Sequence, residues 1–378
     1  SVQAQNLKIY HIDVEQGDST LFVSPSGNTM LVDSGKNGHG SRIKAIMDLA
    51  KVSQIDHLIT THYHEDHYGG IDELIAEPNN VQVINAYDRG DKNHLGDKLN
   101  QPRYIDYDAA IGNRAEHLTR GETIPLDPAM SVTCISSGGV VLGEQNEVHA
   151  GHENDMSVSL HVQFGSFSYF IGGDIELTTE GKIADRDIVM DVDAYQANHH
   201  GSHTSSSLAF MQDLSPSVII ISNGNHGGHK HPRKHTLKQY GKLDPVPVVY
   251  QTNKYLKGGL GGNVPDEFIA DAESVDKDGT ILVTVDQNAG NFTVSYEGHS
   301  KPFQIKGMNE ISTGVVIKSL MPNPKGKDRE LETVTLNNNG TNQIDMSGWK
   351  LQDESGKVWS LSSMGVLESG ESKTIQRN

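Results

Sequence analysis

Apolar and polar positions along the first part of the chain follow two different periods. Short apolar runs bounded by Gly, Asn and Ser predict β-strands, and two segments with apolar side chains three and four residues apart predict helices. The predicted strands cover residues 8–14, 20–24, 29–33 and 56–60, and the predicted helices cover residues 41–51 and 71–75. Strands that alternate with helices in this way indicate an α/β layered fold.

The period changes to two residues between positions 158 and 171. Alternating runs flank Gly165 and Ser166, which predicts a β-hairpin that ends shortly before Asp174. Further strands are predicted at residues 193–197, 217–222 and 246–251, and a last hairpin at residues 281–296. Residues 85–155, by contrast, combine many turn formers with little periodicity. We therefore expect a long irregular segment there, which in compact domains is typical of functional loops.

The apolar pattern weakens around residues 298–312 and then resumes as a β-rich segment. We therefore expect two domains, at residues 1–305 and 312–378. A chain of 378 residues is long enough for two hydrophobic cores. Its apolar runs have the length of strands, far below the roughly 20 residues of a membrane-spanning helix, so no membrane span is predicted.

Composition adds candidate chemistry to this picture. Histidine occurs 19 times and clusters near residues 57–67, 149–161, 199–203 and 226–235. Imidazole is the commonest metal ligand in proteins, so the clustering indicates a metal site. The single cysteine, Cys134, excludes an intrachain disulfide and a cysteine-based zinc site.

Charge is unevenly spread along the chain. The formal net charge is −18, which argues against a protein that coats nucleic acid. Residues 226–258 nevertheless carry seven Lys and Arg residues and one acid, Asp244. We interpret this basic segment either as a solvated helix face or, if it adjoins an active site, as a contact surface for substrate phosphates.

A His-x-His-x-Asp-His motif at residues 62–67 follows the strand predicted at 56–60. Four metal-binding side chains on a loop between a strand and a helix can hold a pair of metal ions from one side. Imidazoles and one carboxylate suit zinc, or a harder metal such as manganese. An exposed polar loop with chance histidines is the alternative, which the spacing disfavours.

This motif resembles the signature of the metallo-β-lactamase fold, an αββα sandwich. The chain resembles most specifically the metal-dependent domain of the competence DNA-internalisation (ComEC-type) proteins, over residues 7–300 and without that family's membrane channel. The segments that carry the resemblance are residues 13–19, 31–33, 154–157, 173–174 and 199–202. Glu15 stands where that family usually has Gly, which is a mild departure.

The resemblance implies two divalent metals per chain, Zn²⁺ or Mn²⁺, and a set of ligands. It assigns His62 and His64 to the first metal, Asp66 and His67 to the second, Asp174 to a bridge, and His199, favoured over His200, to the last position. Asp33 would orient the metal loop from outside the coordination sphere. The first metal lacks the third histidine of true β-lactamases. His149, His152 and His161 could replace it, or they are exposed loop histidines.

The same resemblance implies a phosphodiester hydrolase, in particular a nuclease, that acts on nucleic acid or another phosphodiester with a hydroxide activated by two metals. Asp66 or Asp174 would hold the proton, and His200 and His231 would stabilise the leaving group or the phosphate. Substrate contacts are expected from Asn154, Ser157, Ser202, Lys230, Arg233 and Lys234. Two alternatives stay open: hydrolysis of a lactam or lactone, which the missing third histidine disfavours, and a non-catalytic binding protein with a structural metal, which the intact ligand set disfavours.

The last 66 or so residues read as short strands separated by Gly and Asn, which predicts a small immunoglobulin-like β-sandwich. Residues 321–324, 336–340 and 347–353 resemble the lamin-tail domain, whose last strands would lie beyond Asn378. We therefore expect the domain either to be cropped or to be completed by another element. Bacteria attach such domains to secreted nucleases and hydrolases. The resemblance therefore implies a secreted or periplasmic protein.

Overall fold

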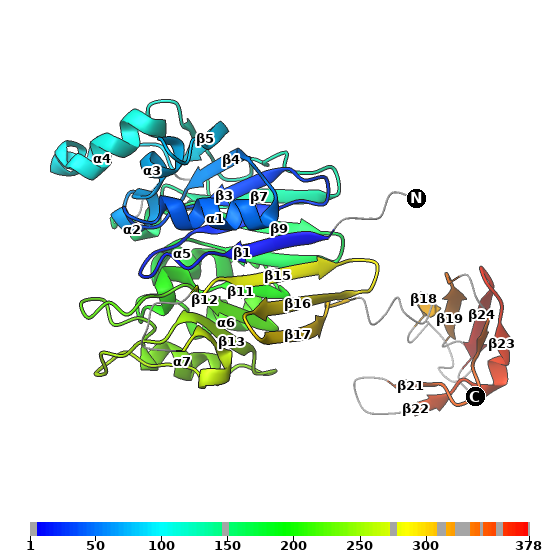
Figure 1. Cartoon of the computed structure of the whole chain (residues 1–378). Helices are drawn as coiled ribbons and strands as arrows, with labels where there is room; N and C mark the ends of the chain where they lie inside the picture. Colours follow the sequence, from blue (N-terminus) through cyan, green and yellow to red (C-terminus); the bar gives the residue numbers. More distant parts are fainter. Residues whose placement is uncertain are drawn as a thin grey trace. The chain divides into compact units, whose positions relative to one another are not determined.

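The computed structural model describes residues 6–145, 151–272, 278–307, 315–321, 333–340, 343–352 and 358–376. The chain divides into two compact units, Ser1–Phe303 and Gln304–Asn378 (Figure 1). The domain boundary expected between residues 305 and 312 falls mostly on residues 308–314, which lie outside the described part. Among the described helices, none combines the length and the apolar character that a membrane crossing requires.

The first unit contains a nine-stranded mixed sheet with the strand order β17-β16-β15-β1-β2-β3-β4-β5-β6. Its strands are β1 (Leu7–His11), β2 (Thr20–Val23), β3 (Thr29–Val32), β4 (Gln54–Thr60), β5 (Gln82–Asp88), β6 (Glu116–His117), β15 (Ile281–Asp286), β16 (Asn291–Tyr296) and β17 (His299–Gln304). β3, β4 and β5 are parallel neighbours. The residues that follow these three strands therefore emerge at one edge of the sheet.

A second, eight-stranded sheet has the order β14-β13-β12-β11-β10-β9-β7-β8. Its strands are β7 (Met130–Ser137), β8 (Val140–Val141), β9 (Ser159–Phe164), β10 (Phe167–Ile171), β11 (Ala194–Gln196), β12 (Val218–Ile221), β13 (Val248–Asn253) and β14 (Ile269–Asp271). β9 and β10 form the predicted hairpin, with Phe164 opposite Phe167. β10, β11 and β12 are parallel, so the residues after them also share one edge.

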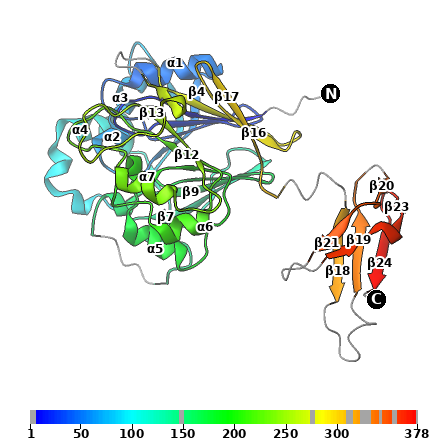
Figure 2. The ribbon, with the colours of Figure 1, turned by 90° about the horizontal axis from the view of Figure 1, so that it is seen from below.

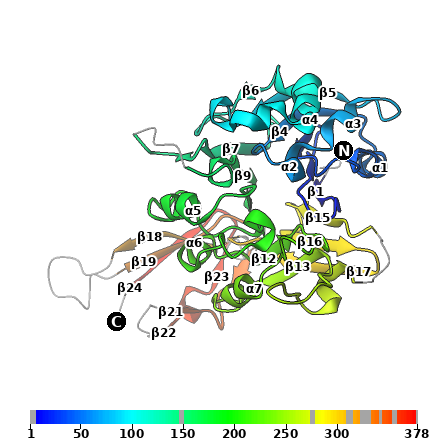
Figure 3. The same ribbon diagram turned by 90° about the vertical axis from the view of Figure 1, so that its left-hand side faces the viewer.

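Helices cover the outer face of each sheet. They are α1 (Gly40–Ala50), α2 (Glu65–Tyr68), α3 (Ile71–Ile75), α4 (Pro102–Tyr107), α5 (Leu177–Ala184), α6 (Leu208–Leu214) and α7 (Lys234–Tyr240). One core joins α1 and α3 to the first sheet, and a second core joins α5, α6 and α7 to the second sheet. Figure 2 shows α1 and α5 on opposite sides of the two sheets, and Figure 3 separates the two groups of helices.

The inner faces of the two sheets pack against each other. The ring of Phe22 on β2 meets Tyr169 on β10 edge to face at 5.6 Å, and Phe167 meets Phe292 on β16 at 5.3 Å. A buried hydrogen bond from the Thr20 hydroxyl to the Gln196 side chain, 2.6 Å long, also joins the sheets. The order helix, sheet, sheet, helix confirms the predicted αββα sandwich.

The segment expected to be irregular, residues 85–155, is ordered over much of its length, and that prediction was wrong. It contains the eight-residue strand β7, helix α4, the 3₁₀-helical segment η1 (Asn93–Asn100) and the π-helical segment η2 (Asp108–Gly112). Apolar and polar residues alternate only over Met130–Cys134, because the last four residues, Cys134–Ser137, are all buried and two of them are serines. The strand lies second from the edge of its sheet, between β9 and β8.

The second unit consists of short strands with a small core. They are β18 (Val315–Met321), β19 (Thr333–Asn338), β20 (Ile344–Asp345), β21 (Lys350–Gln352), β22 (Val358–Ser360), β23 (Val366–Leu367) and β24 (Ser372–Gln376). β18, β19 and β24 form one sheet, and two pairs of strands complete the unit. Trp349 packs against a buried cluster centred on Leu336, Met346 and Leu361. The all-β character predicted for this region is confirmed.

Candidate metal centre

The predicted metal loop leaves the end of β4 and leads directly into α2. His62 and His67 are fully buried, while His64 and Asp66 are partly exposed. The Nε2 atom of His62 lies 3.0 Å from the Nδ1 atom of His64. Two imidazole nitrogens that face each other at this distance are arranged to accept one ion between them.

Asp33, at the end of the neighbouring strand β3, fixes the conformation of this loop. Its carboxylate accepts hydrogen bonds from the backbone and the hydroxyl of Thr61, both at 2.8 Å, and from Nδ1 of His67 at 2.7 Å. The bond to Nδ1 leaves the Nε2 atom of His67 free to face the centre. This carboxylate–histidine pairing is the supporting role expected for Asp33, and it sets the tautomer that a metal ligand needs.

Asp174 occupies the middle of the centre. Its chain segment follows β10, where Gly173 adopts a positive φ of 54° and a Cβ atom would meet Thr61 at 2.7 Å. Oδ1 of Asp174 lies 3.3 Å from Nε2 of His67, and Oδ2 lies 3.7 Å from Nε2 of His62. The two carboxylate oxygens therefore face the two halves of the motif, which is the geometry of a bridging ligand.

The histidine pair after β11 lies on a sharp turn, η4 (Asn198–Gly201), and its two members face different surroundings. His200 is buried, with Nδ1 3.1 Å from the Ser222 carbonyl oxygen and Nε2 3.4 Å from Oδ2 of Asp66. His199 is less buried, and its Nδ1 lies 3.3 Å from Oε1 of Glu176. The sequence favoured His199 as the last ligand. The structure favours His200, because its Nε2 lies among the other ligands of the second metal.

Asp18 is a member of the centre that the sequence analysis quoted only within a motif. Its carboxylate is 2% exposed and lies 3.3 Å from Nδ1 of His200. The approach depends on Gly17, since a Cβ atom there would meet the backbone oxygen of Asp66 at 2.5 Å. The signal available in the sequence was the Gly-Asp step itself, but nothing local links it to a histidine 182 positions away in the chain.

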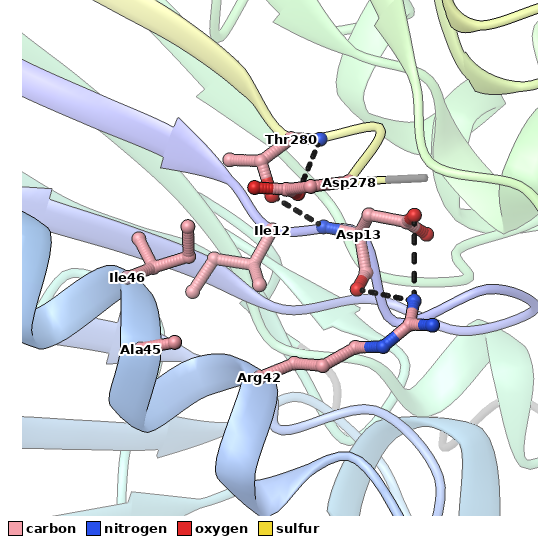
Figure 4. A pocket seen from close by; sticks show the side chains of 7 residues that line it. All are labelled: Ile12, Asp13, Arg42, Ala45, Ile46, Asp278 and Thr280. Carbon is pink, nitrogen blue, oxygen red and sulfur yellow. Dashed lines mark hydrogen bonds and ion pairs between the residues drawn. The ribbon is translucent and has the colours of Figure 1, made fainter. Parts of the chain in front are cut away.

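The loop that carries Asp18 is anchored at Asp13, next to a cavity of about 240 Å³ (Figure 4). The Asp13 carboxylate accepts hydrogen bonds from Asn253 at 2.6 Å and from the backbone of Gly279 at 3.1 Å. Arg42 of α1 lies 3.4 Å from the same carboxylate. Asp13 is thereby committed to its neighbours, so we assign it to holding the loop rather than to binding a ligand in the cavity.

The donor set fits a pair of divalent ions. Asp18, His67, Asp174 and His200 form one group of ligand atoms within 4.8 Å of one another, and His62, His64 and Asp174 form a second group that shares Asp174. Nε2 of His67, Nε2 of His200 and Oδ1 of Asp174 are buried and have no hydrogen-bond partner among the described residues. Buried polar atoms are rarely left without partners, so these three are placed to bind an ion.

The charged side chains of the centre shift one another's pKa values. Burial lowers the pKa of His67, but the carboxylates of Asp174 and Asp33 outweigh it and hold that pKa well above the ordinary value. Burial raises the pKa of Asp66, yet the hydrogen bond from His200 and the charge of His67 bring it below the ordinary value. A depressed pKa keeps the Asp66 carboxyl group ionised, as a metal ligand must be.

Two of the predicted substrate contacts are instead internal supports. Ser157 is fully buried, and its hydroxyl donates to the Asn154 carbonyl at 2.7 Å and accepts from the backbone of Asp174 at 3.2 Å. Ser202 is 2% exposed and lies 3.0 Å from the hydroxyl of Thr204. Burial removes both serines from contact with a substrate. Asn154 stays beside the centre, 3.5 Å from the ring nitrogens of His199.

His231 connects the centre to the basic segment. Its ring lies 5.3 Å from that of His199 and 6.1 Å from that of His200, and Arg233 donates its backbone N–H to the Gly201 carbonyl at 2.9 Å. Burial, reinforced by His200 and His199, lowers the pKa of His231 to about 2. Lys230 is partly exposed, and Lys234 is exposed with its ammonium 2.9 Å from the Gly259 carbonyl oxygen. The basic segment therefore begins at the metal centre, as the phosphate-contact interpretation requires.

The candidate replacements for a third histidine lie elsewhere. His161 on β9 has its Nε2 atom 2.7 Å from the Ser168 hydroxyl, and burial lowers its pKa to about 4. His152 is exposed on the loop before η3 (Asn154–Met156), and His149 lies outside the described residues. Neither His152 nor His161 belongs to the two groups of ligand atoms among the described residues.

Known proteins resemble this chain in both units. The family model of the metallo-beta-lactamase superfamily matches residues 12–222, and the family model of the Lamin Tail Domain matches residues 310–378. The ComE operon protein 3 of Bacillus subtilis is 24% identical over 244 residues, which cover 60% of this chain and 30% of that protein. Recombination protein 2 of Haemophilus influenzae is 25% identical over 232 residues, covering 60% and 26%. The chain thus matches less than a third of the length of these relatives.

A solved structure is similar to part of this chain. The metallo-beta-lactamase fold protein YhfI from Bacillus subtilis is 12% identical, with a TM-score of 0.39, over 65% of this chain and 96% of that chain.

Proposed function

Since the chain belongs to the metallo-beta-lactamase superfamily, we propose that it is a metal-dependent phosphodiester hydrolase, and specifically a nuclease. The observation that carries the proposal is the contact of His231 with the histidine pair, because it brings the basic segment to the metal centre of a chain with a net charge of −18. The match to competence and recombination proteins over the same unit supports a nucleic-acid substrate.

The donor set suits two divalent metals, with His62, His64 and Asp174 at one position and Asp18, His67, His200 and Asp174 at the other. Asp66, whose Oδ2 lies 3.4 Å from Nε2 of His200, adds a carboxylate beside the second position. When bound, such ions lower the pKa of a water molecule and stabilise negative charge on a phosphoryl oxygen. The mixture of imidazoles and carboxylates is compatible with both Zn²⁺ and Mn²⁺. Asp33 orients the imidazole of His67 from behind, and the Ser222 carbonyl oxygen does the same for His200.

Other residues are placed to hold the substrate. Glu176 and Thr204 lie 3.3 and 3.1 Å from Nδ1 of His199, which directs the opposite ring edge toward Asp174. His199 and Asn154 can then donate hydrogen bonds to phosphoryl oxygens beside the centre. In this proposal, Lys230, Arg233 and Lys234 contact the flanking phosphates of a polymer, which contribute affinity through release of counterions.

The proposal is tested by a hydrolysis panel on the full chain, loaded with zinc and with manganese. The substrates are bis-p-nitrophenyl phosphate, DNA, RNA, nitrocefin and a lactone, and Asp174→Asn serves as the inactive control. We expect hydrolysis of the phosphodiesters alone. Turnover of nitrocefin or the lactone without phosphodiester hydrolysis, or metal binding without any turnover, would overturn the proposal.

A charge reversal separates a polymeric substrate from a small diester. Lys230→Glu combined with Lys234→Glu should reduce DNA hydrolysis. The slope of the logarithm of DNA affinity against the logarithm of salt concentration should become less steep by roughly 0.9 for each phosphate that is no longer bound. Lys238→Glu with Lys242→Glu is the matched control, since these residues make the same charge change further along α7 and beyond it. Equal effects of the two double substitutions would show that the basic segment is an ordinary solvated surface.

A further inference from the structure

The turn that carries the histidine pair has an unfavourable backbone conformation. His199 has φ/ψ of 51°/44° and His200 of 54°/26°, and Gly201 continues with φ 75°. Residues other than glycine rarely adopt the left-handed region, and two in succession are rarer still. Such strain persists only where the surroundings enforce it. The structure must therefore contain groups that hold this turn.

Glu180 of α5 is placed to do so. Its carboxylate is fully buried, and Oε1 accepts hydrogen bonds from the side-chain amide of Asn198 at 2.8 Å and from the backbone of Ser206 at 2.6 Å. Oε2 accepts from the backbone of Ser207 at 2.8 Å. Asn198 directly precedes the histidine pair, and Ser206 and Ser207 end the loop that follows it. One carboxylate thus joins the two ends of the loop.

The chemistry of this carboxylate is unusual for a purely structural residue. Burial outweighs three hydrogen-bond donors and raises the pKa of Glu180 to about 7. Among the described residues, no Lys, Arg or His side chain forms an ion pair with it. A buried carboxyl group without a cation is unfavourable unless hydrogen bonds satisfy it, and three donors do so here.

We propose that Glu180 is a positioning residue of the metal centre, which holds the His199–His200 turn in the conformation that directs both imidazoles toward Asp174. It acts through Asn198, whose backbone N–H is also held by the Tyr195 hydroxyl at 2.8 Å. The inference rests on the metal centre of the proposed function but not on the identity of the substrate. It adds a residue 18 positions before Asn198, on a helix that supplies no ligand.

The test compares Glu180→Gln with Tyr240→Phe in the full chain. The Tyr240 hydroxyl lies 2.9 Å from the Ser206 hydroxyl, so its removal perturbs the same buried region without releasing Asn198. In Glu180→Gln, an amide NH₂ group replaces one carboxylate oxygen. The NH₂ group cannot accept the hydrogen bond that the oxygen accepted, because it is only a donor. The readouts are the dissociation constants of the two metals, from competition with a chelator, and the visible spectrum of the Co²⁺-loaded protein.

We expect Glu180→Gln to weaken binding of at least one metal by about 10- to 100-fold, the effect typical of groups that support a ligand, and to change the Co²⁺ spectrum. Tyr240→Phe should match the wild type in both. If Glu180→Gln fails to fold, Asn198→Ala removes one of the three bonds and should give a smaller change of the same kind. The inference would be overturned if Glu180→Gln or Asn198→Ala had the metal affinity and the Co²⁺ spectrum of the wild type. A failure of the proposed function would instead leave metal binding intact and abolish only phosphodiester hydrolysis.

Discussion

A buried ion pair beside the metal loop allows a quantitative prediction. Arg89, which follows β5, is fully buried and donates two hydrogen bonds to Glu153, from Nε to Oε1 and from the guanidinium to Oε2, both at 2.8 Å. Oε1 of Glu153 also accepts the backbone N–H of Tyr63, within the metal loop, at 2.7 Å. The guanidinium carbon of Arg89 lies 4.3 Å from the centre of the Tyr63 ring. The pair thus joins the metal loop to the segment that leads into Asn154.

Glu153→Gln neutralises one partner and removes the negative charge that faces the buried Arg89 guanidinium. Removal of one partner of a buried pair is expected to lower the free energy of unfolding by about 3–5 kcal/mol. The double variant Arg89→Met with Glu153→Leu leaves no uncompensated charge and should be less destabilised than Glu153→Gln. Because Tyr63 loses a charged acceptor in Glu153→Gln, metal affinity should fall as well.

The measurement is urea unfolding of the metal-free full chain. Both tryptophans, Trp349 and Trp359, belong to the second unit, so tryptophan fluorescence follows that unit and provides an internal control. Far-ultraviolet circular dichroism follows mainly the first unit, where the midpoint should shift at a constant slope. A decrease below about 1 kcal/mol would refute the reasoning, because that is the range of an ordinary exposed pair. An equal shift in the tryptophan transition would show a non-specific effect.

Two further predictions concern the histidine pair and pH. His200→Ala should retain about one metal per chain after reloading, whereas His199→Ala should retain two and lose substrate affinity. Elemental analysis measures the metal content of both variants, and the reverse result would restore His199 as the ligand. The raised pKa of Glu180 means that its contribution to stability is fully present below the unfolded value of 4.5 and is lost as the pH rises through about 7. The stability of the metal-free wild type relative to Glu180→Gln should therefore fall by up to about 3 kcal/mol between pH 5 and pH 8, and a difference independent of pH would contradict the assignment.

Much of the fold and the nucleus of the site could be predicted because their signals are local. The motif at residues 62–67 places four candidate ligands in one loop. The turn at Gly165 predicts a hairpin whose second strand leads to Asp174. The spacing alone is sufficient in such cases, because short loops and hairpins leave few conformations to their side chains. Strand β7 was missed for the converse reason, since its buried end is rich in serine.

The tertiary structure shows which residues contact the candidate ligands and favours His200 over His199. Asp18 meets His200, Glu153 meets Arg89, and Glu180 meets Asn198 only because separate strands and helices bring them together. Ser157 is a polar residue in a matching motif, yet packing buries it completely. By itself the sequence determined the type of fold and the chemistry of the metal loop, which depend on patterns within one segment. The partners of each imidazole, and the choice between His199 and His200, depend on contacts between distant segments and on one strained turn, and no local pattern records these.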